Sequence, residues 1–169
     1  MDRKFTLELI QVGTQGKNAL YSIRFEDEPL NEFDKFLENE ALQQEPEFDE
    51  MIEELFRLLD KRSFSSHYFK QKKYPSPTCA YYFKGKLRLY GCLYGSTIFI
   101  AGNGGIKRTR TIQEDPLLHT FFDDMKMVAQ HIDREIIQQK SMLVSDRGFL
   151  EPQSRKLIER QSFNVNDDE

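Results

Sequence analysis

Tryptophan is absent from this 169-residue chain, and cysteine occurs only twice. Cys79 and Cys92 form no CxxC pair and have no Cys/His ligand set around them, so we expect two reduced thiols and no disulfide. No apolar run approaches the roughly 20 residues needed to cross a bilayer, and the first residues lack the apolar segment of a secretory signal. These absences predict a cytoplasmic protein that makes no contact with a membrane.

The signatures of the common enzyme classes are also missing. The stretch GNGGIKRT at 102–109 fits neither the GxxxxGK[ST] spacing of a P-loop nor GxGxxG, and the chain contains no GxSxG, HExxH or EF-hand loop. His119 and His131 are too far apart on one predicted helix to share a metal ion. We therefore expect no cofactor and no metal.

Carboxylates are missing from one continuous part of the chain. Residues 61–110 contain 11 Lys or Arg and no Asp or Glu, although the whole chain carries a net charge of −4. Residues 1–60, by contrast, contain 16 acids and 6 bases. Such asymmetry indicates a site for an anion or polyanion. The alternative is that the basic middle of the chain neutralises the acidic helices within the fold.

The length predicts one domain, with a core supplied largely by 14 Phe and 7 Tyr. Alternating apolar residues predict strands at 5–12 and 19–26, joined as a hairpin. Helical periodicity predicts helices at 29–40 and 45–61, with their acids on the solvent side. Residues 62–77 lack periodicity and are expected to form a loop. Three short runs with glycine turns between them predict an antiparallel meander at 79–83, 86–93 and 97–101.

A long amphipathic helix is predicted at 113–137, with Asp115 as its N-cap and Pro116 as its first residue. The expected fold class is therefore α+β, with an antiparallel sheet. We expect a single domain over 1–139. Residues 140–169 are expected to form a C-terminal extension with a small strand or turn and a disordered end.

The acid-free stretch supplies the residues that could act on a phosphate-rich ligand, which needs cationic donors and, where bases stack, aromatic rings. The candidate catalytic residues are Arg88, Tyr90 and Arg110. The candidate nucleic-acid-binding residues are Lys70, Lys72, Lys73, Lys107 and Arg108. A loop that lets the backbone approach the ligand is expected at Gly102, Asn103, Gly104 and Gly105. The candidates for proton transfer, ranked below Arg88, are Tyr90, His67 and a lysine of the 70–73 segment.

Two blocks of the sequence resemble the RelE/ParE toxin superfamily, and the HigB-like branch in particular. They are LYSIRFEDEPLNEFDKFL and KLRLYGCLYGSTIFIAGNGGIKRTRTIQEDP, and the correspondence covers about residues 19–135. The resemblance implies the RelE/ParE fold and a cytoplasmic toxin of a toxin–antitoxin pair. It implies that Arg88 matches the family's strand arginine and that Lys107 and Arg108 match the basic pair after the last strand.

Members of that superfamily cleave mRNA on the ribosome or act on gyrase. The resemblance thus implies an endoribonuclease whose partners are mRNA, the ribosome and an antitoxin, for which we expect a helix-turn-helix protein. Two alternatives stay open, because a fold does not determine an activity. One is a non-catalytic module that binds nucleic acid or protein. The other is a homodimer in which the basic stretch pairs with acidic helices.

Overall fold

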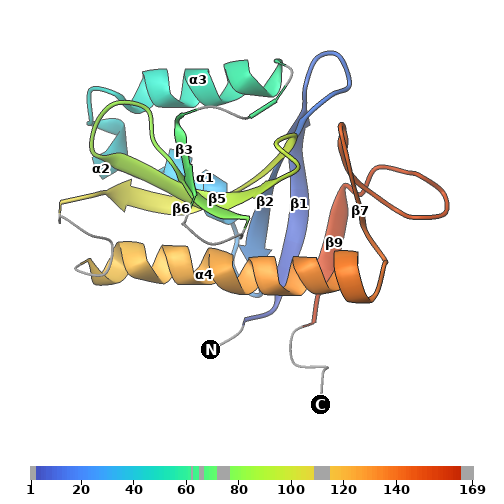
Figure 1. Ribbon diagram of the computed structural model, residues 1–169. Coiled ribbons are helices and arrows are strands. Elements are labelled where there is room, and N and C mark those ends of the chain that lie inside the picture. Colours follow the sequence, from blue (N-terminus) through green and yellow to red (C-terminus); the bar gives the residue numbers. More distant parts are fainter. Residues whose placement is uncertain (1–2, 62, 65–66, 72–76, 109–114, 165–169) are drawn as a thin grey trace.

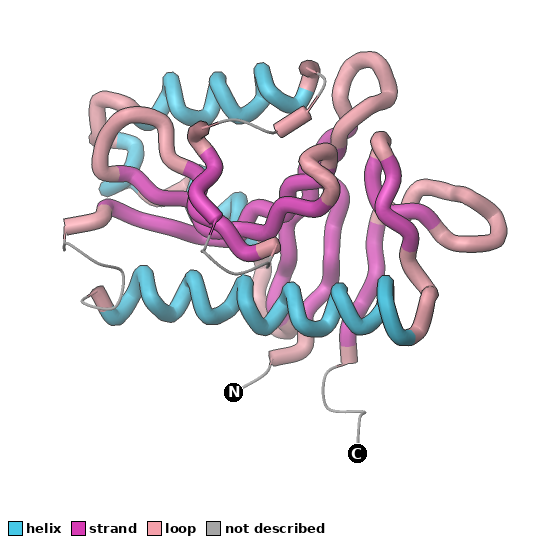
Figure 2. Tube along the Cα trace, viewed as in Figure 1, coloured by secondary structure: helices cyan, strands magenta, loops and turns pink. Residues whose placement is uncertain are grey.

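A seven-stranded sheet with helices on both faces forms the centre of the computed structural model (Figure 1). The structure describes residues 3–61, 63–64, 67–71, 77–108 and 115–164. In spatial order the strands are β3 (Phe69–Gln71), β4 (Thr78–Tyr81), β5 (Leu87–Tyr94), β6 (Ile98–Ile106), β2 (Ala19–Phe25), β1 (Phe5–Val12) and β9 (Arg160–Phe163). Figure 2 shows these strands as one layer between helices. The predicted α+β class is confirmed.

The sheet is mostly antiparallel, with one exception at its centre. The predicted N-terminal hairpin is confirmed, because β1 pairs antiparallel with β2 from Phe5 opposite Phe25 onward. The predicted meander is present as β4, β5 and β6, each antiparallel to the next. The hairpin and the meander meet through β2 and β6, which run parallel, with Ser22 opposite Ala101. The sheet is therefore mixed, and not antiparallel throughout as predicted.

In the described part of the chain, one face of the sheet is covered by α1 (Glu32–Leu37), α2 (Glu40–Gln43) and α3 (Phe48–Leu59). The helix predicted at 29–40 is shorter, because the side chain of Asn39 accepts hydrogen bonds from the amides of Ala41 and Leu42 and starts α2 there. The apolar stripe of α3 follows the predicted pattern and packs on the sheet. The core on this face includes Phe33, Phe36, Met51, Leu55, Leu87, Leu89 and Phe99.

The other face is covered by α4 (Pro116–Asp133), which continues into a short π-helical turn, η2 (Arg134–Gln138). The N-cap prediction is confirmed, since the carboxylate of Asp115 accepts a hydrogen bond from the Leu118 amide. Buried side chains of α4 include Leu118, Phe122, Met125, Val128 and Ile132.

None of the helices in the described part of the chain combines the length and the apolar character that a membrane crossing requires.

The segment predicted to be a C-terminal extension contributes to the same core. A small hairpin of β7 (Leu143–Ser145) and β8 (Gly148–Leu150) precedes β9, and β9 pairs with β1 at the edge of the main sheet. The hydroxyl of Tyr21 donates to the Ile158 carbonyl at 2.7 Å and accepts from the Phe149 amide at 3.1 Å. Phe149 and Phe163 are buried in the core under α4. Disorder was predicted for 164–169, and of these residues 165–169 lie outside the described part of the chain.

Candidate nucleic-acid interface

The four residues expected to form a glycine-rich loop instead lie inside β6, which runs to Ile106. The prediction of a loop at Gly102, Asn103, Gly104 and Gly105 is therefore wrong. These glycines leave room for neighbouring atoms. A Cβ at Gly102 would lie 2.6 Å from the sulfur of Met125, and a Cβ at Gly105 would lie 2.9 Å from Leu118, both on α4. The glycines thus let α4, from Leu118 to Met125, pack directly against the backbone of β6.

Arg88 lies on β5, opposite Gly105 of β6. Its Nη1 atom donates one hydrogen bond to the carbonyl oxygen of Gly85 at 2.7 Å and another to the carbonyl oxygen of Leu87 at 3.0 Å. The guanidinium carbon also lies 4.3 Å from the centroid of the Tyr82 ring. No carboxylate pairs with Arg88 among the described residues. The charge is therefore held in place by neutral groups and is not cancelled by a carboxylate of those residues.

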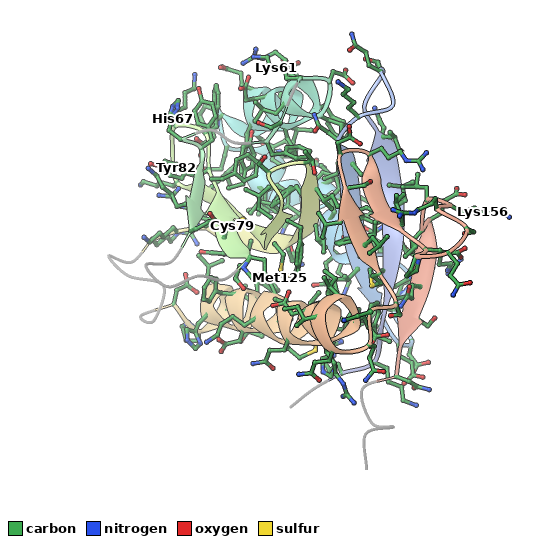
Figure 3. All side chains as sticks on the ribbon, turned by 45° about the vertical axis from the view of Figure 1, so that its right-hand side comes forward. Lys61, His67, Cys79, Tyr82, Met125 and Lys156 are labelled. Carbon is green, nitrogen blue, oxygen red and sulfur yellow. The ribbon has the colours of Figure 1, made fainter. Side chains whose placement is uncertain are left out.

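Tyr82 is shared by a second cation from the neighbouring strand. Lys70 lies on β3, opposite Ala80 of β4, and its ammonium is 5.6 Å from the centroid of the same ring. Both distances are within the range of favourable cation–π contacts. Figure 3 shows Tyr82 on the same side of the molecule as His67. We call Lys70, Tyr82 and Arg88 the Arg88 surface.

The basic pair after β6 lies at one end of the β5–β6 ladder. The amide of Lys107 donates to the carbonyl of Lys86 at 2.7 Å, so the backbone pairing extends one residue past Ile106. Arg108 follows and is exposed. Because Lys86 is two residues from Arg88, this bond brings the start of the basic pair close to the Arg88 surface. The other predicted site residues Lys72, Lys73 and Arg110 lie outside the described residues.

Tyr90 is not accessible at this surface. It is 3% exposed, and its ring packs edge-on against Phe122 of α4 with centroids 5.9 Å apart. Burial raises the pKa of the Tyr90 phenol to about 12. Although Tyr90 shares a face of β5 with Arg88, as expected, α4 covers that face from Tyr90 onward. The structure thus places Tyr90 in the core, and we do not include it among the site residues.

Sequence reasoning missed Tyr82, the aromatic residue that does contact Arg88. A signal was present in the AYYF stretch. Because strand residues alternate between faces, burial of Tyr81 on the α3 side places Tyr82 on the opposite side, the side of Arg88. The partner strand β3 gave no such signal, since its three residues fall within the segment predicted to be a loop.

Not all cations of the acid-free stretch belong to the Arg88 surface. Lys84 forms an ion pair with Glu50 of α3 at 2.9 Å, with both side chains more than half exposed. Lys84 and Lys86 line a shallow pocket together with Glu45 and Glu47. The alternative prediction, neutralisation by the acidic helices, therefore describes Lys84 but not Arg88.

No protein-family model, curated protein or solved structure matches this chain.

Of the two histidines on α4, His119 makes a local contact within the helix, and His131 packs its ring edge-on against Phe5 of β1 with centroids 6.3 Å apart. The Nδ1 atom of His119 lies 3.0 Å from the carboxylate of Asp123, one helical turn away. Within the described ranges, no group of three or more His, Cys, Asp or Glu side chains is arranged to hold a metal ion. The chemistry available at the Arg88 surface is thus that of cations and an aromatic ring: binding phosphate, stacking on a base and stabilising developing negative charge.

Proposed function

We propose that the Arg88 surface binds single-stranded RNA and that the protein is a cytoplasmic toxin of the RelE/ParE type, which cleaves mRNA on the ribosome. The observation that supports this is that one aromatic ring, Tyr82, lies within cation–π distance of two cations, Lys70 of β3 and Arg88 of β5. A base can stack on such a ring while the phosphates beside it meet Arg88 and Lys70. The sequence resemblance supplies the reaction and the ribosomal setting.

Cleavage would proceed by attack of a ribose 2′-oxygen on the adjacent phosphorus. The 2′-hydroxyl loses its proton, the bond to the 5′-oxygen breaks, and that oxygen takes up a proton, leaving a 2′,3′-cyclic phosphate. The protein contributes mainly orientation and charge stabilisation. Arg88 suits this role because two backbone carbonyls and the Tyr82 ring fix its guanidinium in advance. Proton transfer falls to a lysine of the 70–73 segment in this proposal.

The test is mRNA cleavage in a purified translation reaction, read by primer extension. Arg88→Ala should lower the cleavage rate about 100-fold or more, the usual effect of removing one charge-stabilising donor. Lys84→Ala is the matched control, because it removes a cation of the same stretch that pairs with Glu50. Tyr90→Phe should leave cleavage unchanged, since that phenol is buried. Wild-type protein that leaves mRNA intact would refute cleavage.

The second candidate is a non-catalytic RNA-binding module on the same surface. The burial of Tyr90 favours it, because it removes one of the candidate proton-transfer groups. This candidate predicts salt-sensitive RNA binding without any product. Tyr82→Ala should then weaken RNA binding by about 1–3 kcal/mol, the value of one base stacked on an aromatic ring. Unchanged affinity in that variant would count against both candidates.

An antitoxin would be the natural partner of either form of the protein. To inhibit it, the antitoxin must cover the Arg88 surface, and an acidic segment would do so by replacing RNA phosphate with carboxylate. We expect a small helix-turn-helix protein with such a segment. Competition between this partner and RNA for wild-type protein, lost when Arg88 and Lys70 are both changed to Glu, would support the assignment.

A further inference from the structure

A second site lies on the other side of β3 from Lys70. A cleft of about 880 Å³ opens between the β1–β2 turn, the C-terminal half of α3 and the segment that leads into β3. Among its lining residues are Lys17, Arg57, Asp60, Lys61, His67 and Tyr68. Figure 3 shows Lys61 and His67 on this part of the molecule, while Lys156 lies on the opposite side. Its volume is within the range of ligand-binding pockets.

The two carboxylates in the cleft are already engaged by neighbours. Glu54 accepts two hydrogen bonds from Arg57, each 2.7 Å long, in a forked pair. The carboxylate of Asp60 accepts a hydrogen bond from the backbone amide of Thr14 at 2.9 Å. Lys17 and Lys61 are exposed, and neither ammonium pairs with a carboxylate in the part of the chain that the structure describes. Among the described lining residues, three cations (Lys17, Arg57 and Lys61) face two carboxylates (Glu54 and Asp60), so the cleft carries one net positive charge and can attract an anion.

One wall of the cleft is aromatic. The ring centroids of His67 and Tyr68 lie 4.1 Å apart, and those of Tyr68 and Phe83 lie 5.2 Å apart. Phe83 in turn packs against the core under α3. The buried side chain of Leu58 adds an apolar contact at the base of the cleft. A ligand that carries a flat ring and a negative group together would use both the aromatic wall and the cations, whereas a bare anion would leave the aromatic wall unused.

We propose that this cleft binds one nucleotide unit, with the base against the wall formed by His67 and Tyr68 and the phosphate between Lys17 and Lys61. The same unit can come from two sources, a free nucleotide or a nucleotide of an RNA strand. Tyr68 and Lys70 are two residues apart, so a strand that crosses β3 could occupy the cleft and the Arg88 surface together. Binding of a free nucleotide does not depend on the proposed cleavage.

The experiment is a calorimetric titration of the full chain with adenosine 5′-monophosphate, with adenosine and with inorganic phosphate. The doubly substituted variant Lys17→Gln, Lys61→Gln should bind adenosine monophosphate about tenfold more weakly or worse, because it loses two charged contacts to phosphate. The matched control is Lys140→Gln, Lys156→Gln, which removes the same charge from exposed positions outside the cleft and should bind like wild type. Thermal melts check that both variants fold.

Three results would overturn the proposal. The first is that adenosine monophosphate does not bind at millimolar concentration. The second is that inorganic phosphate and the nucleotide bind with equal affinity. The third is that the cleft variant and the control lose the same amount of affinity for adenosine monophosphate. A parallel titration with a short oligouridylate identifies the source. Weaker binding of the oligonucleotide by the cleft variant assigns the cleft to the RNA strand, and unchanged binding assigns it to free nucleotides. Either answer stands even where no RNA cleavage is detected.

Discussion

Replacing Gly104 with alanine should destabilise the protein strongly, because the new methyl group would meet main-chain atoms. A Cβ built at Gly104 lies 1.8 Å from the carbonyl oxygen of Arg88 and 2.8 Å from its carbonyl carbon. An ordinary carbon–oxygen contact is about 3.3 Å or longer, so β5 and β6 would have to separate by more than about 1 Å. A side chain could rotate away, but this oxygen belongs to the β5–β6 ladder.

Overpacking of this kind costs about 1–3 kcal/mol, and the rigid contact places Gly104→Ala at the upper end. In a chain of this size, about 3 kcal/mol lowers the melting temperature by roughly 6–12 °C. Gly105→Ala is the matched control. Its Cβ would lie 2.9 Å from the end of the flexible Leu118 side chain, so we expect a loss of about 1 kcal/mol.

The measurement is differential scanning calorimetry of both variants beside wild type, supported by urea denaturation. A melting temperature for Gly104→Ala within about 2 °C of wild type would refute the reasoning. It would show that the glycines are not needed for close strand packing. A loss larger in Gly105→Ala than in Gly104→Ala would contradict the contacts from which the difference was derived.

Burial raises the pKa of the Asp124 carboxyl from 3.8 to about 6. Between these two pH values the folded state holds a proton that the unfolded state has released. The free energy of unfolding therefore falls as the pH rises from about 4 to about 6. Asp124→Asn should therefore raise the free energy of unfolding by about 1–2 kcal/mol at neutral pH and by almost nothing in strong acid. Urea denaturation at the two pH values measures this difference. An equal gain at neutral and at acid pH would contradict the pKa shift. Tyr21→Phe removes the hydroxyl between the Ile158 carbonyl and the Phe149 amide and should cost about 1–3 kcal/mol. Hydrogen exchange at Phe149 should accelerate, and unchanged protection there would mean that the hydroxyl does not join these segments.

Local signals in the sequence predicted the elements that depend on neighbouring residues. The N-cap at Asp115, the stripe of α3 and the alternation of β1 and β2 each need only a few adjacent positions, and the structure has all three. The same reasoning placed Arg88 on one face of β5. Its cation–π partner was missed because a second strand brings Tyr82 beside it.

Features that depend on distant pairing could not be predicted from the sequence. β9 has little alternation of its own, and its place is set by β1, more than 150 residues earlier, where Thr6 and Ser162 are 156 positions apart. The glycines of β6 suggested a loop because glycine is usually unfavourable inside a strand. Only the approach of α4 and β5 shows why small residues are required at Gly102 and Gly104.

The parallel pairing of β2 with β6 has a consequence for how quickly this chain reaches its native state. The hydroxyl of Ser22 donates to the Ala101 carbonyl, 79 positions along the chain. The hairpin and the meander can each form from nearby residues, but their junction must close a long loop, and the entropy of that closure comes before any contact is gained. We expect the rate-limiting step of refolding to be the docking of these two halves, so substitutions at the β2–β6 seam should slow folding more than substitutions in either hairpin.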